Sequence, residues 1–212
     1  MSTSDATMTA NATTSRPYHH GDLRRALVTA ATELARSGGS EGVGLREAAR
    51  RVGVSPSAAY RHFPSRDGLL ALVGSEAREA LAARMQAATA EIRGSSGKAA
   101  RARFRATGRA YIEFALEEPG LFEVAFRPCP PSLYVPDDPS PYEELSAALD
   151  ALERAGLLAI PRLGAEAPAW VAVHGAAVLL GDGLLPRDSR DPIIEATLDM
   201  VADGLLRSRT RA

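Results

Sequence analysis

The sequence lacks several features that whole classes of protein require. It contains one cysteine, Cys129, in 212 residues, so no disulfide can form within the chain and a reducing compartment is its natural setting. The longest apolar run, residues 169–180, is interrupted by His174 and is too short to span a bilayer. A basic segment followed by an apolar stretch is also missing at the N-terminus, which argues against a signal peptide. We therefore expect a cytoplasmic protein with no membrane partner.

Catalytic patterns are missing as well. The sequence has no glycine-rich phosphate loop, no cluster of acids and histidines, and no Ser/His/Asp arrangement at a strand–turn–helix. His19 and His20 are adjacent, but neighbouring histidines on an extended segment seldom point the same way, and no further His or Cys lies nearby. We predict no catalytic residue, no metal site and no cofactor.

Composition and charge favour a helical protein with a basic N-terminal part. Hydrophobic residues make up 45% of the chain, and alanine-rich segments favour helix throughout. Residues 16–75 carry nine arginines and five acids, a net charge of +4, although the whole chain has a net charge of -1. A basic head on a mildly acidic body is typical of a protein that binds a polyanion.

Two short helices joined by a tight turn are predicted in residues 45–63. The first has apolar residues at helical spacing on one face: Leu45, Ala48, Ala49 and Val52. Gly53 ends it, because glycine adopts positive φ without steric cost. Ser55 is the expected N-cap of the second helix and Pro56 its first residue, while Ala59 and Phe63 face the first helix. This is a helix-turn-helix.

Residues 53–70 closely resemble the DNA-binding signature of the TetR family of transcriptional regulators. They read Gly-Val-Ser-Pro-Ser-Ala-Ala-Tyr-Arg-His-Phe-Pro-Ser-Arg-Asp-Gly-Leu-Leu. The resemblance implies an all-α fold with an N-terminal three-helix head and a C-terminal helical body that binds a ligand and dimerises. This sequence departs from the family at three positions. Gly44 replaces the usual Ser or Thr cap, and Pro56 and Ala58 stand where many members carry Lys and Thr, which removes a phosphate contact and a hydroxyl at the bases.

The predicted DNA contacts lie on the second helix of the motif and next to it. Tyr60 and His62 match family residues that commonly touch phosphates, and Arg46 is positioned for another phosphate. Ser57 and Ala58 lie in the turn that enters the major groove, where small side chains let the backbone approach. The full predicted set is Arg46, Ser55, Ser57, Ala58, Tyr60, Arg61 and His62.

A further helix precedes this motif. It is predicted from an N-cap at Asp22 to Gly38-Gly39, with Arg24 and Arg25 in its first turn. These two arginines either face DNA phosphates or simply keep the surface soluble. Residues 1–15 are polar without periodicity and are expected to be a disordered tail. We therefore divide the chain into this tail, a DNA-binding domain at 16–64 and a ligand-binding and dimerisation domain at 65–212.

The body is predicted to consist of amphipathic and apolar helices. They span residues 65–92, 99–117, 121–126, 142–155, 168–185 and 192–206. Residues 127–141 contain six prolines and are expected to form a surface loop. The run Trp170-Val171-Ala172-Val173-His174-Gly175 resembles the Trp-x-x-x-His-Gly signature of one variety of TetR-family C-terminal domain.

Aromatic residues and one histidine of the body are candidates to line a ligand cavity. They are Phe104, Tyr111, Phe114, Phe122, Phe126, Trp170 and His174. An aromatic stripe at helical spacing is also what an ordinary core requires. His174 needs a polar partner on its apolar helix, and that partner is either a ligand or another group of the protein.

The last two helices are apolar over more than half their circumference, and a second copy of the chain is the expected cover. The predicted dimer interface comprises Val173, Ala177, Leu180, Ile194, Leu198 and Val201. The leading hypothesis is a homodimeric repressor that a small, largely apolar effector releases from double-stranded operator DNA. A ligand-insensitive DNA-binding dimer and a helical enzyme that uses the body's cavity are the alternatives.

Overall fold

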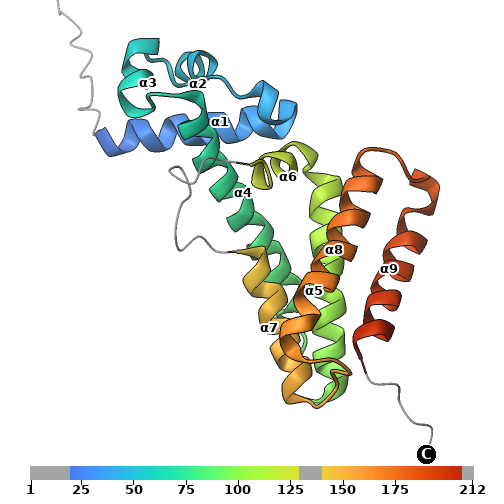
Figure 1. Ribbon diagram of the computed structural model, residues 1–212. Coiled ribbons are helices and arrows are strands. Elements are labelled where there is room, and N and C mark those ends of the chain that lie inside the picture. The colour runs from blue at the N-terminus through green and yellow to red at the C-terminus, as the bar shows by residue number, and fades with distance from the viewer. Residues whose placement is uncertain (1–19, 129–139, 207–212) are drawn as a thin grey trace, which may run out of the picture.

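The computed structural model describes residues 20–128 and 140–206, and nine α-helices account for most of this part of the chain (Figure 1). The expected all-α fold is confirmed. The only β interaction among the described residues is an isolated bridge between Leu158 and Leu206. The predicted tail, Cys129 and most of the proline-rich segment lie outside the described residues.

The N-terminal head consists of α1 (His20–Gly42), α2 (Leu45–Val52) and α3 (Pro56–His62). Helix α1 begins two residues before Asp22, so the predicted cap at Asp22 is wrong. Its backbone leaves helical geometry at Gly38 and Gly39, where the sequence predicts its end, and Gly39 has a φ of 57°. This positive φ turns the chain toward α2 at low steric cost because the residue is glycine.

The helix-turn-helix has the predicted geometry. Gly53 is left-handed with a φ of 78°, and its amide and the next one donate to carbonyls of the last turn of α2. The Ser55 hydroxyl accepts a hydrogen bond of 3.2 Å from the amide of Ala58, which caps α3. Gly44 caps α2 without a side-chain hydrogen bond. Ala59 and Phe63 are buried against the head core, which confirms the predicted inner face.

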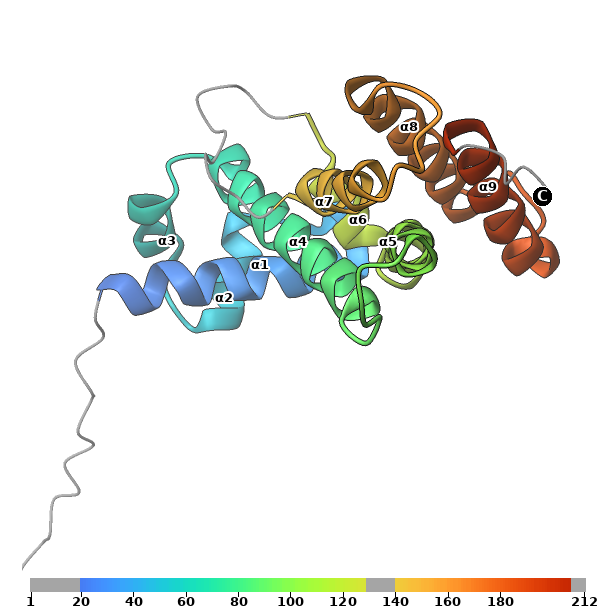
Figure 2. The ribbon, with the colours of Figure 1, turned by 90° about the horizontal axis from the view of Figure 1, so that it is seen from below.

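The body contains α4 (Arg66–Thr89), α5 (Gly97–Glu117), α6 (Pro119–Ala125), α7 (Pro141–Arg154), α8 (Arg162–Gly181) and α9 (Arg190–Leu205). Helix α5 lies in the middle and contacts each of the other five (Figures 1 and 2). Helix α4 joins the two parts, because Leu69, Leu70 and Val73 pack with the head and Leu81 and Met85 continue the same core into the body. The head and the body therefore share one hydrophobic core.

Helix α8 is longer than predicted. It begins at Arg162 rather than Pro168, and Pro168 lies inside it. The additional turn and a half is held by Arg162, whose guanidinium contacts Glu166 one turn later and Asp150 on α7, at 2.8 and 2.6 Å. These contacts offset the backbone hydrogen bond that the proline cannot make.

At this length, α8 is long and apolar enough to cross a membrane, with a mean hydropathy of 1.4. This length comes from the added first turns of the helix, since the apolar run within it is still residues 169–180 with His174 inside. The helix nevertheless packs on α5, α7 and α9, and it contributes Ala169, Val173 and Ala177 to the core. One face of this helix is therefore buried in the core, while only 33% of its apolar window is buried in all.

Helix α6 docks on the end of α1 by an unusually close approach. A Cβ atom at Gly120 would lie 2.1 Å from the carbonyl oxygen of Ala35 and 3.0 Å from that of Arg36. Polar contacts surround this point: Arg36 donates to Glu118 at 2.8 Å, and the Ser40 hydroxyl donates to Glu123 at 2.6 Å. Backbone contact with no intervening side chain thus fixes the body to the head.

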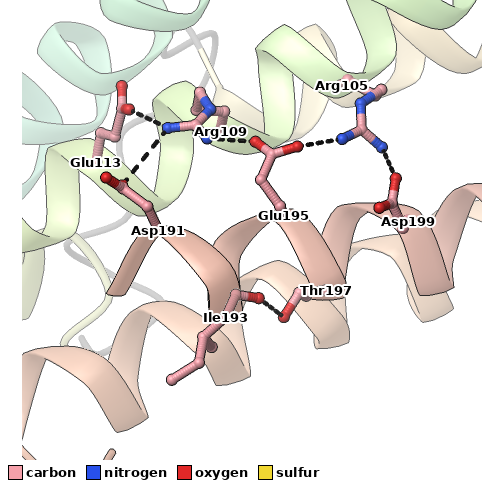
Figure 3. A network of polar contacts seen from close by, with 8 residues as sticks. All are labelled: Arg105, Arg109, Glu113, Asp191, Ile193, Glu195, Thr197 and Asp199. Atoms are coloured by element: carbon pink, nitrogen blue, oxygen red, sulfur yellow. Dashed lines mark hydrogen bonds and ion pairs between the residues drawn. The ribbon is translucent and has the colours of Figure 1, made fainter. Parts of the chain in front are cut away.

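A network of ion pairs attaches α9 to α5 (Figure 3). Glu195 lies between Arg105 and Arg109 and contacts both guanidinium groups, and Arg105 also reaches Asp199. Arg109 is 2.9 Å from Glu113 and 3.9 Å from Asp191. The hydrogen bond from Arg109 lowers the pKa of Glu195 below its ordinary value of 4.5.

The network makes stability depend on pH in a predictable direction. The pKa of Glu195 is lower in the folded chain than in the unfolded one. Its contribution to the free energy of unfolding is therefore complete above the pKa of the unfolded chain and is lost as the pH falls through the pKa of the folded chain. We expect the urea midpoint of the wild type to fall more steeply below about pH 4.5 than that of Glu195→Gln. Glu79→Gln, at an exposed acid on α4, is the control and should follow the wild type. Equal pH dependence of the wild type and Glu195→Gln would contradict the assignment.

Candidate nucleic-acid interface and effector cavity

The outer face of α3 presents a small polar and aromatic surface. Ser55, Ser57 and Arg61 are exposed, Tyr60 is 45% exposed, and Ala58 and His62 are half-buried. The hydroxyls of Ser55 and Ser57 lie 3.0 Å apart at the start of the helix. The side chains predicted to contact DNA on α3 therefore gather on one side of the motif, opposite Ala59 and Phe63.

Helix α2 adds arginines to this region, but they are not equivalent. Glu47 accepts hydrogen bonds from Arg50 at 2.8 and 2.7 Å and from Arg51 at 3.4 Å. The bond from Arg50 is the main reason that the pKa of Glu47 is lowered to about 2. Arg46 is exposed and makes no ion pair with a described residue. It is thus the α2 arginine whose charge is not offset by Glu47.

Arg24 has a structural role that the sequence did not reveal. Its guanidinium donates to the carbonyl of His62 at 3.2 Å and lies over the ring of Phe63, 4.6 Å from the centroid. It therefore holds the C-terminal end of α3 against α1. Arg25 is exposed, so both interpretations from the sequence remain: it either faces DNA phosphates or keeps the surface soluble.

The body contains an aromatic cluster that joins α5, α6 and α8. Tyr111 contacts Phe122, Phe126 and Trp170, with ring centroids 5.6, 5.9 and 5.1 Å apart. His174 stacks on Trp170 with an interplanar angle of 11° and meets Phe126 edge to face. These are five of the seven residues that the sequence predicted for the effector site.

A hydrogen bond lies at the centre of this cluster. The Tyr111 hydroxyl and the Nδ1 atom of His174 are 2.8 Å apart. Burial raises the pKa of Tyr111 and lowers that of His174, so both groups are neutral near pH 7. The partner that His174 requires is therefore a side chain of the protein itself.

A small apolar cavity, called the aromatic cavity below, adjoins the cluster. Its wall is formed by Met85, Phe104, Thr107, Gly108, Tyr111, Leu145, Ala169, Trp170, Val173, Leu198 and Val201. Its volume is about 20 Å³, enough for about one water molecule. Three predicted ligand residues, Phe104, Tyr111 and Trp170, line it. Phe114 is buried in the main core and belongs neither to this wall nor to the aromatic contacts described above.

The six residues predicted for the dimer interface lie in the interior of the subunit. Val173, Ala177, Leu180, Ile194, Leu198 and Val201 are all buried by the chain's own helices. Val173, Leu198 and Val201 even line the cavity. Their placement in an interface is therefore wrong, because the apolar pattern of these helices did not tell the inner face from the outer one.

The outer face of α8 and α9 is also apolar. Val171 on α8 is 68% exposed and Met200 on α9 is 65% exposed, and Val178 and Leu179 are exposed on α8. Gly175, half-buried in the same row of α8, has nothing within 4 Å of an added Cβ. This outer face is the part of α8 and α9 that remains available to another molecule.

Two family models match the chain. "Bacterial regulatory proteins, tetR family" matches residues 27–73, and "Tetracyclin repressor-like, C-terminal domain" matches residues 104–203. Together they cover the helix-turn-helix and most of the body. No protein of curated function matches the chain significantly.

Solved structures share the fold over nearly its whole length. A protein of unknown function from Rhodococcus sp. RHA1 is 29% identical with a TM-score of 0.75, covering 91% of this chain and 100% of that one. A putative TetR family transcription regulator from Shewanella sp. PV-4 has 18% identity and a TM-score of 0.62, covering 88% of this chain and 99% of its own. A TetR family transcription regulator from Marinobacter aquaeolei VT8 has 16% identity and a TM-score of 0.60, with 88% and 96% covered.

The matches extend over the two parts that the sequence distinguished, and the family consists of transcriptional regulators rather than enzymes. The order of the two matched models, an N-terminal regulator domain followed by a C-terminal domain, agrees with the helix-turn-helix head and the helical body of this chain. The chain belongs to the TetR family of ligand-responsive, DNA-binding transcriptional regulators.

Proposed function

We propose that this regulator is a cytoplasmic homodimeric repressor that a small, largely apolar effector releases from its operator. The observation that carries the proposal is the continuity of the aromatic cluster with α6, which itself docks on α1 of the head. We also propose the division at residue 64 and assign the body to the Trp-x-x-x-His-Gly variety. That assignment is supported by the stacking of Trp170 on His174.

In the DNA complex, α3 enters the major groove with its N-terminal turn. Ser57 and Ala58 approach the bases, where a methyl group can meet thymine. Ser55 holds that turn through its cap to Ala58. The side chains of Arg46, Tyr60, Arg61 and His62 lie toward phosphates. Phosphate contacts supply most of the affinity and little of the specificity.

The effector binds by enlarging the cavity beside the aromatic cluster. The present volume of about 20 Å³ is far below the ~300–1,000 Å³ of ligand pockets, so this conformation is a closed one. Tyr111 and Trp170 belong both to the cavity wall and to the aromatic cluster. Opening the cavity must therefore displace rings that contact Phe122 and Phe126.

Displacement of these rings reaches the head through α6. Phe122 belongs to α6, and Gly120 of the same helix lies against the backbone of α1. Helix α4 contacts α6 as well, since Arg78 donates to the carbonyl of Ala125 at 3.0 Å. A shift of α6 thus changes the orientation of the head. The effector releases DNA only as far as it binds this second orientation more tightly.

Dimerisation is assigned to the outer face of α8 and α9. Val171, Val178, Leu179 and Met200 provide the apolar surface, and Gly175 allows close approach of two backbones. The network of Arg105 and Arg109 with Glu195 holds α9 in place behind this face. Two heads joined in this way have a fixed separation, which a palindromic operator requires.

Tyr60 tests the DNA interface. Replacing Tyr60 with Ala removes an exposed side chain outside the head core, so folding should be unchanged. We expect affinity for operator and non-operator DNA to fall by similar factors in fluorescence anisotropy titrations, because a phosphate contact carries no sequence information. The wild type should show a log–log salt slope of about -0.9 per phosphate neutralised, and the variant should keep that slope because the neutral tyrosine side chain neutralises no phosphate. Thr29→Ala, at an exposed site on α1, is the control; unchanged affinity of the Tyr60 variant would remove this residue from the interface.

His174 and Tyr111 test the effector site. His174→Leu leaves the buried Tyr111 hydroxyl without its partner and should lower stability by about 1–3 kcal/mol. Adding Tyr111→Phe removes the unsatisfied hydroxyl and should restore most of that loss. Operator affinity should be unchanged in the double variant, because neither residue contacts DNA and no buried hydroxyl is left unpaired to disturb the packing of α6.

Effector response separates a binding role of this pair from a purely structural one. Trp170 is the sole tryptophan and lies in the cavity wall, so its fluorescence reports binding during a screen for effectors. If the pair binds the effector's polar group, the double variant should still need about tenfold or more effector to release DNA, although its stability is restored. An unchanged midpoint in the double variant would assign the pair to the core alone. A chain that no effector releases from DNA would be the ligand-insensitive dimer.

Val178 tests the dimer. Val178→Glu places a charge on the outer face of α8 and should yield monomers in sedimentation velocity, with normal helicity. Glu153→Val, at an exposed site on α7, is the matched control and should stay dimeric. A dimeric Val178→Glu protein would place the interface elsewhere.

A further inference from the structure

A second cleft lies at the end of the body nearest the head. Helices α5 and α8 end there and α9 begins there, beside the first turn of α6 (Figure 1). Its wall is formed by Ala115, Leu116, Pro119, Leu180, Gly181 and Arg190. Its volume is about 420 Å³, within the ~300–1,000 Å³ range of ligand pockets. This cleft shares no wall residue with the aromatic cavity.

Arg190 is the charged residue of this cleft, and its hydrogen-bonding capacity is unused. The Nε atom is buried and has no hydrogen-bond partner among the described residues. A buried guanidinium N–H without an acceptor is unfavourable, and native structures rarely leave such a donor unpaired. The Nε atom of Arg190 therefore needs a hydrogen-bond acceptor that the described part of the chain does not supply.

Nearby acids do not meet that requirement. Glu117 pairs with Arg84 at 2.9 Å, Glu118 with Arg36 at 2.8 Å, and Asp191 with Arg109 at 3.9 Å. The other two acids of the α8–α9 connection, Asp182 and Asp188, are exposed and form no ion pair with Arg190. The positive charge of the cleft is thus not neutralised by the described part of the chain.

The helix ends around the cleft also favour an anion. Ser189, which precedes α9, makes no side-chain cap, and Arg190 in the cleft wall is the first residue of α9, so the positive end of this helix lies beside the cleft. The last carbonyls of α8 are already satisfied, because Gly183 donates to Leu180 and Leu184 donates to Leu179. The apolar remainder of the wall comes from the side chains of Ala115, Leu116, Pro119 and Leu180.

We propose that this cleft binds a small carboxylate with an apolar body. Its oxygens accept hydrogen bonds from the guanidinium of Arg190, and its hydrocarbon part lies against Leu116 and Leu180. Pro119 is the first residue of α6, so the ligand touches the helix that docks on the head. The site is separate from the aromatic cavity, and its existence does not depend on the effector site proposed above.

Octanoate and its neutral analogue octanamide are suitable probes, titrated by calorimetry into the full-length protein. Octanoate should bind the wild type, and Arg190→Met should weaken it about tenfold or more, because a charge-assisted hydrogen bond is lost. Octanamide should be affected less than octanoate by this change. Arg190→Lys retains the charge and should give an intermediate affinity. Arg93→Met, at an exposed arginine between α4 and α5, should bind octanoate as the wild type does.

Two further variants locate the site. An added Cβ at Gly181 meets nothing within 4 Å, so Gly181→Leu should fold normally while filling the cleft and weakening both probes. His174→Leu, in the aromatic cluster, should leave octanoate binding unchanged, which separates this site from the proposed effector site.

Three results would overturn the proposal. The first is a wild-type protein that binds no octanoate, and the second is an Arg190→Met protein, folded by circular dichroism, that retains full affinity. The third is loss of octanoate binding in His174→Leu but not in Gly181→Leu. If Arg190→Met instead dissociates the dimer in sedimentation while octanoate does not bind the wild type, the acceptor for Arg190 belongs to a second copy of the chain.

Discussion

The contact of α6 with α1 is the constraint on which the arrangement of the molecule depends. Because position 120 has no side chain, the first turn of α6 lies directly against the carbonyls at the end of α1. Arg36 with Glu118, and Ser40 with Glu123, hold the contact in register. Because no side chain separates the two backbones at this point, one helix cannot shift without moving the other. Helix α6 thus contacts α1 of the head through Gly120 and the aromatic cluster through Phe122.

Local signals in the sequence were sufficient to predict the head and the fold class. Gly53, Ser55 and Pro56 act within a few residues of their own positions, and the structure has the turn, the cap and the helix start that they predict. Helix limits in the body were less predictable, because distant partners set them. The start of α8 before Pro168 depends on contacts of Arg162 with α7, which no local pattern contains.

The body sites could be predicted only in part. Helical periodicity showed that α8 and α9 are apolar, but it could not decide which face meets the chain's own core, so buried residues such as Ile194 were assigned to the interface. The aromatic residues could be identified because the chain has few of them. The pairing of His174 with Tyr111 could not be predicted, because the two residues are 63 positions apart in the sequence. Arg190 was not singled out, since its lack of a partner is a property of three-dimensional packing.

The small volume of the aromatic cavity has a consequence for how the regulator senses its surroundings. A protein whose binding-competent state is a minor population shows an apparent affinity reduced by the fraction of molecules in that state. In the proposed effector site the rings around Tyr111 must separate before an effector fits, so the free energy of opening would set a concentration threshold. Mutations that loosen this packing would lower the threshold without touching the effector. In the proposed switch, the packing of the core therefore sets the sensitivity to the effector, and it can be changed separately from the chemical specificity.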